Sequence, residues 1–378
     1  MGRGSVRNWV HHPDRGVLAD RWSRLIAAHN EERGPLLKQT RDRTIDTRFA
    51  PSAFDPVDRR SLRQERCRTA TTVRVAFRSF DRQYLIADER VVDYPGPALW
   101  KVQGPQQLYL VSQMRKPLSA GPAAIATVDV PDTDYLHGRG GVVIPMYRDA
   151  ECRHVNVTPK LPALLSRRLG ISVRGAEVML YVIGVVSHAG YTARFADELT
   201  QPGVRIPLTA DPVLWRAAVA IGRSVARLHG FGEWPGDKPP GIPAELRPRV
   251  VAPFSIRPED MPEALDYDAE QRCLRVGTGA LAPVEPEVMQ YQVSGLFVVR
   301  HWFDYRKRRP AGRRGGSPLD DIIGTHWTDA MTEDLRDVVA VLTGCIRLEP
   351  EQADLLDRIV AGPLITTKEL AEAGVLPG

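Results

Sequence analysis

The chain has 378 residues, of which 43% are hydrophobic and 26% are charged, and its formal net charge is +5. This length suits one large or two ordinary domains, and the composition is that of a globular protein. No run of about 18 apolar residues occurs, so we expect no membrane span. The first 30 residues are polar and basic, which predicts no secretory signal.

The four cysteines, Cys67, Cys152, Cys273 and Cys345, lie far apart and form no CxxC pair. This spacing favours free thiols in a reducing compartment over a zinc site or a disulfide framework. We therefore predict a cytoplasmic protein.

Positive charge is concentrated at the N-terminal end. Residues 1–78 hold 17 Lys/Arg against 9 Asp/Glu, whereas the remaining residues hold 34 against 37. A polyanionic partner is the natural inference, because each neutralised phosphate releases counterions. Arginine far outnumbers lysine, but a GC-rich genome would produce the same bias, so that ratio is not evidence of function.

Residues 1–70 are predicted to form a basic helical lead-in and a polar connector. Asp14 is placed to cap a helix that ends near Gly34-Pro35. One face of this helix carries Leu18, Trp22, Leu25, Ile26 and His29. His11-His12 precedes it and is expected to be a surface pair.

Residues 71–147 are predicted to form a sheet. Short β-rich runs alternate there with turns, namely TTVRVAF, QYLI, RVV, LYLVS, AAIATVDV and GVVIPMY. Pro-Gly-Pro at 95–97 and the glycine-rich stretch at 137–141 mark breaks between them.

Residues 161–230 follow a helical pattern. The run VMLYVIGVV is buried by its apolarity, whether as helix or strand, and Asp211-Pro212 is a helix start. A proline-rich loop near 233–263 follows, and then a β-rich return at about 273–299.

The C-terminal end is expected to be helical. Met331, Leu335, Val338, Val339 and Leu342 form one apolar stripe. Pro350 is predicted to start a second helix that Gly362-Pro363 stops, and Thr366 with Glu369 forms a capping box for a third. Helices joined by GPLIT fit a DNA-reading helix-turn-helix or, more commonly, a structural helical hairpin.

These elements predict an α+β fold, with a mixed sheet, flanking helices and a helical C-terminal end. We divide the chain into a lead-in and connector (1–70), an α+β core (71–327) and a C-terminal helical segment (328–378).

Residues 291–316 combine an apolar run with aromatic residues and a basic cluster. Seven Lys/Arg against one acid lie between Arg300 and Arg314. Guanidinium groups match phosphate oxygens and the edge of guanine, and an aromatic ring beside them can stack on a base. The simpler interpretation is a solvated loop after a buried strand, with Trp302 and Phe303 in the core.

Catalytic motifs are missing from the sequence. It contains no Gly-Lys pair for a phosphate loop, no His-Glu pair for an HExxH zinc site and no GxSxG nucleophile. It also lacks an [Asp/Asn]-Pro-Pro-aromatic methyltransferase motif and any [Asp/Glu]-x-Lys nuclease triplet. Asp320-Asp321 is more typical of a turn or cap than of a metal pair. We expect no catalysis by this chain alone and no cofactor.

Five segments, taken in order, resemble one family. They are RNWVHHPDRGVLADRWSRLIAAHNEE, VAFRSFDRQYLIADERVVDYPGPALW, GVVIPMYRD, EVMLYVIGVVSHAGYTARFADELTQPGVRIPL and VEPEVMQYQVSGLFVVRHWFDYRKRR. Together they span roughly residues 5 to 347 and resemble the C-terminal specificity domain of Type ISP restriction–modification enzymes. The chain departs from the family pattern at Ser79 and in an inserted PAGRRGG loop after Arg309.

In the family, one long polypeptide carries a nuclease, a helicase-like ATPase, an adenine-N6 methyltransferase and this target-recognition domain. Since the motifs of the first three are missing here, the resemblance implies a target-recognition module. The implied partners are double-stranded DNA and a methyltransferase or nuclease polypeptide encoded nearby. Phosphate contacts would position the duplex and a few side chains would read base edges.

The predicted DNA-contacting residues form two groups. The first is Arg300, His301, Tyr305, Arg306, Lys307, Arg308, Arg309, Arg313 and Arg314; the second, in the FRSFDRQ turn, is Arg78, Asp81 and Arg82. Asp81 is suited to accept a hydrogen bond from cytosine N4 or to orient an arginine. Two other hypotheses stay open: a divergent AdoMet-dependent DNA methyltransferase, and a helical protein-interaction scaffold.

Overall fold

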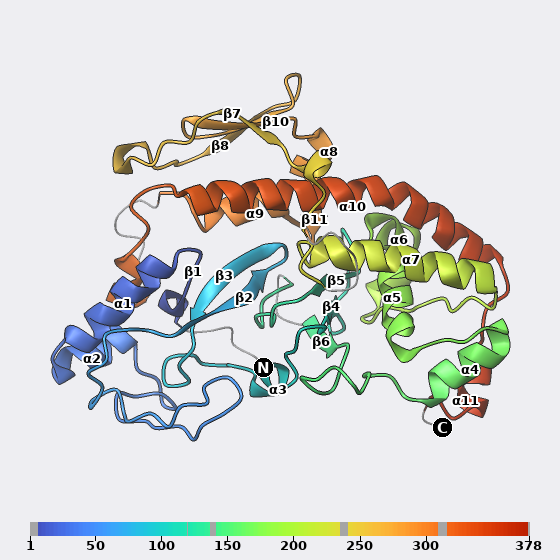
Figure 1. The fold of residues 1–378 in the computed structure, drawn as a ribbon, viewed down its shortest axis with the longest axis horizontal. Helices are drawn as coiled ribbons and strands as arrows, with labels where there is room; N and C mark the ends of the chain where they lie inside the picture. The colour runs from blue at the N-terminus through green and yellow to red at the C-terminus, as the bar shows by residue number, and fades with distance from the viewer. Residues whose placement is uncertain (1–6, 119, 137–140, 235–240, 309–315, 377–378) are drawn as a thin grey trace.

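The computed structural model describes residues 7–118, 120–136, 141–234, 241–308 and 316–376. It confirms the α+β fold class and the helical C-terminal end (Figure 1). The α-helices are α1 (Arg15–Ala27), α2 (Asn30–Leu37), α3 (Pro97–Lys101), α4 (Lys160–Leu169), α5 (Gly175–Val186), α6 (Ala189–Arg194), α7 (Pro212–His229), α8 (Pro286–Gln290), α9 (Val298–Asp304), α10 (Asp329–Ala361) and α11 (Thr367–Glu372).

The strands form small antiparallel sheets with the orders β1-β3-β2, β5-β4-β6, β7-β10-β9-β8 and β11-β12. Their bounds are β1 (His11–His12), β2 (Thr72–Arg78), β3 (Asp81–Ile86), β4 (Tyr109–Gln113), β5 (Ala124–Thr127), β6 (Gly141–Pro145), β7 (Arg249–Ala252), β8 (Leu265–Asp268), β9 (Cys273–Val276), β10 (Gly279–Ala282), β11 (Gln292–Val293) and β12 (Leu296–Phe297). Short 3-10 turns are η1 (Asn8–Val10), η2 (Glu198–Thr200), η3 (Ala244–Leu246), η4 (Pro258–Asp260) and η5 (Pro318–Asp321).

The N-terminal part is built from α1, α2 and the β1-β3-β2 sheet around one apolar core. The Asp14 carboxylate accepts a hydrogen bond from the Gly16 amide, as predicted for a cap. The predicted helix is split, however: Ala28 and His29 are extended, and Gly34-Pro35 lies inside α2. The RVV run at 90–92 is a turn and not a strand, and its valines are apolar because they fill this core.

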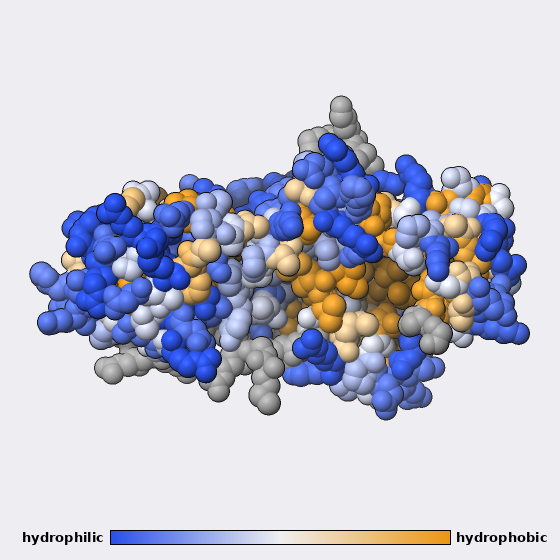
Figure 2. All heavy atoms as spheres, turned by 90° about the horizontal axis from the view of Figure 1, so that it is seen from below, coloured by the Kyte–Doolittle hydropathy of each residue, from blue (hydrophilic) through white to orange (hydrophobic). Residues whose placement is uncertain are grey.

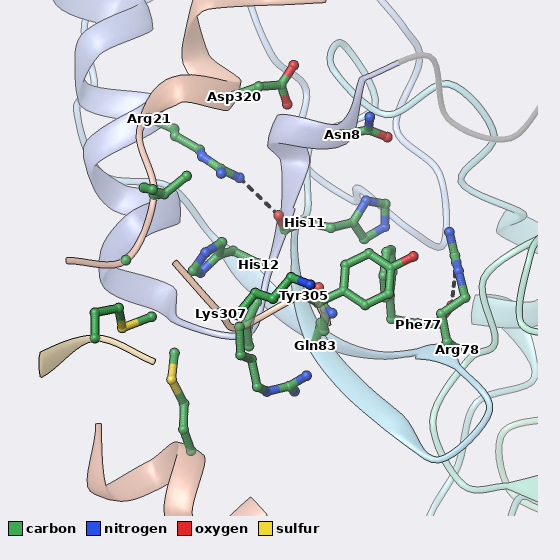
Figure 3. Close-up of a pocket in the computed structure, with 16 residues that line it drawn as sticks. Asn8, His11, His12, Arg21, Phe77, Arg78, Gln83, Tyr305, Lys307 and Asp320 are labelled. Carbon is green, nitrogen blue, oxygen red and sulfur yellow. Dashed lines mark hydrogen bonds between the residues drawn. The ribbon is translucent and has the colours of Figure 1, made fainter. Parts of the chain in front are cut away.

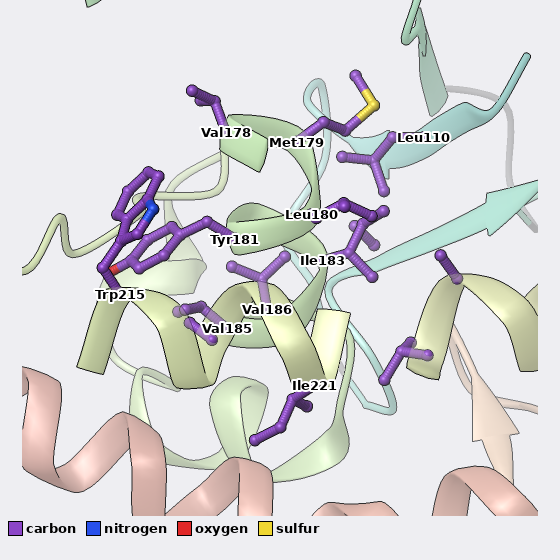
Figure 4. Close-up of a cluster of buried hydrophobic side chains, with 14 of the residues drawn as sticks. Leu110, Val178, Met179, Leu180, Tyr181, Ile183, Val185, Val186, Trp215 and Ile221 are labelled. Carbon is purple, nitrogen blue, oxygen red and sulfur yellow. The ribbon is translucent and has the colours of Figure 1, made fainter. Parts of the chain in front are cut away.

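Helices α4 to α7 pack beside the β5-β4-β6 sheet, and VMLYVIGVV is a helix, α5. Gly184 and Gly222 let α5 and α7 approach closely: a Cβ on Gly222 would lie 1.8 Å from the Leu180 carbonyl oxygen. Tyr181 stacks on Trp215 with ring centroids 4.3 Å apart (Figure 4). This tight pair gives the sheet a rigid support.

The proline-rich stretch is not only a loop, because β7 lies within it and pairs with β10. The resulting four-stranded sheet lies above α10 in Figure 1.

Helix α10 runs through Pro350 without a break, which corrects the predicted helix start there. Its first half packs in a central core with α8 and α9, and its second half packs against α5 and α7. Packing on both sides of Pro350 outweighs the hydrogen bond that a proline removes.

Helix α11 has the predicted Thr366–Glu369 capping box. Its Glu369 pairs with Arg168 of α4. This ion pair joins α11 to α4.

Figure 2 shows how apolar residues gather in a hollow at the end of the molecule that carries α4 to α7, whereas the N-terminal end is mostly hydrophilic on that face. Among the described residues, no helix is long and apolar enough to cross a membrane.

Candidate nucleic-acid interface

The first half of the 291–316 stretch is framework. Strands β11 and β12 form a two-residue hairpin, in which Ser294 and Gly295 have φ values of 49° and 81°. Helix α9 follows directly and buries Val299, Trp302 and Phe303 in the central core. Trp302 and Phe303 therefore lie in the core, as the simpler interpretation has it, but they belong to a helix and not to a strand.

Arg306 lies inside the protein, with its side chain 0% exposed. Its Nη2 donates to the Asp81 carboxylate at 2.7 Å, its Nη1 donates to the Trp302 carbonyl at 2.9 Å, and its guanidinium lies 3.7 Å from the centre of the Trp302 ring. Asp81 is also buried. In this position neither side chain is available to a phosphate or to a base edge, and the pair instead ties α9 to β3.

Arg78 and Arg82 are held by acids. The Arg78 guanidinium donates to Asp132 at 2.8 Å, and that carboxylate raises the pKa of Arg78 against the opposing effect of burial. Arg82 lies over the Phe231 ring and donates to Glu233 at 2.8 Å. The carboxylates of Asp334 and Asp337 on α10 lie 3.7 Å from it. Arg82 is therefore a link between β3 and α10.

Three of the predicted residues border solvent on α9 or just after it. Arg300 is exposed and makes no ion pair with any described residue. Lys307 is partly exposed and pairs with Asp304 at 2.5 Å. Arg308 is partly exposed and donates to the Glu259 carbonyl at 3.0 Å. Arg309, Arg313 and Arg314 lie outside the described residues.

Tyr305 and His301 form the aromatic part of the same region. Both are partly buried, with their rings in edge contact at 5.2 Å, and Tyr305 also meets the Phe77 ring at 4.9 Å. Phe77 belongs to β2, so these contacts bring the two predicted groups of residues together.

A pocket of about 250 Å³ collects four predicted residues, Arg78, Tyr305, Arg306 and Lys307. Figure 3 shows that residues from the N-terminal part line the same pocket. Those residues include Asn8, His11, His12, Arg21 and Gln83, and Asp320 of η5 also lines the pocket.

Sequence reasoning missed the N-terminal side of this pocket. The expected surface pair is wrong for His11, which is buried; burial lowers the pKa of His11 to about 4, partly opposed by Asp132. Arg21 is buried too, and its Nη1 donates to the carbonyls of Trp9 and His11. The His-His pair next to a basic segment was the only available signal, since β1 has just two residues.

A second missed residue is Arg115, in the loop after β4. It is exposed and makes no ion pair with any described residue. The loop reaches the β11-β12 hairpin, because the Ser294 amide donates to the Ala120 carbonyl at 3.2 Å. The loop that carries Arg115 and the helix that carries Arg300 thus both adjoin this hairpin, although 185 residues separate the two arginines in the chain.

The comparisons with known proteins agree with this architecture. A family model described as the Type ISP C-terminal specificity domain matches residues 1–338. The chain therefore belongs to the Type ISP C-terminal specificity domain family, and the family prediction is confirmed. No curated protein matches the chain.

Solved structures share the fold at low sequence identity. A cryoEM structure of the DrdV–DNA complex is 18% identical, with a TM-score of 0.60 over 94% of this chain. The Type ISP restriction–modification enzyme LlaBIII bound to DNA is 14% identical, with a TM-score of 0.59 over 94%. A nuclease-deletion mutant of LlaGI with a DNA substrate mimic is 16% identical, with a TM-score of 0.54 over 92%. The chain spans 35%, 23% and 26% of these proteins, respectively.

Proposed function

We propose that this chain is the module that recognises a specific double-stranded DNA sequence for a restriction–modification system. The family match over residues 1–338 carries the proposal. The shared fold supports it, because the three solved relatives are DNA complexes or a complex with a DNA mimic.

In this proposal the duplex lies along the end of α9 and the β11-β12 hairpin. Arg300, Lys307 and Arg308, together with Arg115, contact phosphates, because these basic side chains reach solvent. Arg309, Arg313 and Arg314 stay predicted phosphate contacts. His301, Tyr305 and Arg78 lie nearer to the bases. Arg82, Asp81 and Arg306 position these elements and do not contact DNA.

In this proposal, methylation and cleavage of DNA are carried out by other polypeptide segments or chains. The chain spans at most 35% of the solved relatives, and we propose that an adenine-N6 methyltransferase and a nuclease act with it in the cytoplasm. The three proposed units, 1–70, 71–327 and 328–378, would then serve recognition and docking.

Selection from a random-sequence duplex library tests the proposal. The full chain is expected to enrich one sequence, to bind it at least about a thousandfold more tightly than random duplex, and to lose affinity linearly with the logarithm of salt concentration. Equal affinity for all duplexes would contradict sequence recognition and favour an interaction scaffold. Heat on titration with AdoMet alone would favour a divergent methyltransferase.

A further inference from the structure

The pocket between β1, β3 and the end of α9 has the size of a small planar ligand. Its volume of about 250 Å³ lies just below the range of about 300–1,000 Å³ that is typical of drug-sized ligands. The exposed Asn8 and the partly exposed Lys307 both line it, so the pocket reaches solvent, and Lys307 belongs to the proposed DNA surface (Figure 3).

The charges that line this pocket are already compensated. Arg78 faces Asp132, Arg306 faces Asp81 and Lys307 faces Asp304. Arg21 shares the pocket with Asp320. A phosphate deep inside would add a negative charge without a matching cation, whereas a neutral heterocycle would not. The pocket therefore favours an uncharged polar ring.

The walls supply what such a ring needs. Phe77, Tyr305 and His11 are aromatic, and rings of this kind stack on or wedge beside a base. Arg306 also lines the pocket, but its side chain is fully buried and held by Asp81 and the Trp302 carbonyl, so it shapes the wall and does not bind the base. Asn8 adds an exposed amide, the group that pairs with adenine edges in many complexes.

We propose that this pocket receives a single nucleobase that leaves the stack of the bound duplex. The inference rests on the proposed function. The base would insert between the α9 end and β1, while the exposed cations hold the backbone phosphates beside the mouth. Unpairing a base costs free energy, and that cost is smallest where the base is already mismatched.

The experiment uses the full chain and the duplex that library selection identifies. Each nucleotide of that site is replaced in turn, once by a mismatched base and once by an abasic nucleotide, and both affinities are measured. At one position the mismatch is expected to bind about tenfold more tightly than the paired duplex. The abasic nucleotide there is expected to lose this gain, since it has no base to insert.

Gly324 offers a way to fill the pocket. It lines the cavity outside the left-handed region, and a Cβ there would meet only the His12 ring, at 3.8 Å. Gly324→Leu is expected to abolish the mismatch gain and Gly324→Ala to reduce it, both with an unchanged salt slope. If Gly324→Leu lowers the unfolding midpoint, Tyr305→Ala takes its place and is expected to reduce the same ratio.

The outcomes separate the pocket from the proposed function. A selected sequence without a mismatch gain at any position overturns base insertion and leaves DNA recognition standing. An equal gain from abasic and mismatched nucleotides indicates DNA bending alone and also overturns it. A gain that survives Gly324→Leu in a folded protein places the base elsewhere. Failure to enrich any sequence contradicts both proposals together.

Discussion

The arginines of the N-terminal part are mostly structural, whereas two of those on or just after α9 are exposed to solvent. Arg7, Arg21, Arg33 and Arg90 are buried and donate to carbonyl oxygens or carboxylates. Arg300 and Arg308, in contrast, reach solvent. The connector at 38–70 forms no strand or α-helix among its described residues, so its carbonyls need donors, and the five N–H groups of a guanidinium supply them. A count of arginines thus overstates the DNA surface.

The largest expected effect concerns Arg306, which by sequence belongs to the surface cluster and by structure to the interior. Arg306→Met leaves Asp81 as an unpaired buried charge and is expected to lower the free energy of unfolding by about 3–5 kcal/mol. Denaturant titration measures the loss. Arg306→Met combined with Asp81→Leu should restore much of it, and Lys307→Ala, the neighbouring control, should change stability by less than about 0.5 kcal/mol. Equal stability of the single variant and the wild type would place Arg306 at the surface.

Next in size is Arg33, the clearest case of an arginine that satisfies the connector. It donates to the carbonyls of Ala28 and Leu62, among others. Arg33→Ala leaves those oxygens unsatisfied and should cost about 3 kcal/mol in the free energy of unfolding. Arg24→Ala, on the exposed side of α1, is the matched control and should cost under about 0.5 kcal/mol. Similar losses in both variants would remove the distinction between buried and exposed arginines.

Sequence patterns gave the α+β class, the strands of 71–147 except RVV, the capped helices α1, α7 and α11, and the family. These patterns failed where long-range packing decides the length of a helix or the burial of a side chain. Pro350 looks like a helix start, but cores on both sides carry α10 through it. Arg306 and Arg300 are alike in sequence, and only their positions, Arg300 on α9 and Arg306 just after it, separate a buried ion pair from an exposed cation. The pocket is lined by both Asn8 and Tyr305, which lie far apart in the chain, and no local pattern reports such a juxtaposition.

One buried histidine in the N-terminal part and one in the α4–α7 part should make the stability of the protein depend on pH. Burial lowers the pKa of both His11 and His188 to about 4. Their folded-state pKa lies below the unfolded value of 6.5, so the stability they contribute is complete above pH 6.5 and falls as the pH drops toward 4.

When the pH falls from 7 to 5, each of these histidines should lower the free energy of unfolding by about 2 kcal/mol. His188→Leu is expected to remove its share of this pH dependence, as measured by denaturant titration at both pH values. His154→Ala removes an imidazole at an exposed position and is the matched control. A pH dependence that His188→Leu does not alter would show that His188 is not buried in its neutral form.

The smallest effect on folding is expected at Arg300, and there the comparison becomes functional. Arg300 is exposed and makes no ion pair with any described residue, so Arg300→Glu should change the free energy of unfolding by less than about 0.5 kcal/mol. It should nevertheless weaken binding to every duplex and lower the slope of log affinity against log salt by about 1. Arg216→Glu makes the same charge change at an exposed site on α7. If both variants weaken binding equally, net charge alone attracts DNA; a loss confined to Arg300→Glu places the phosphate backbone against α9.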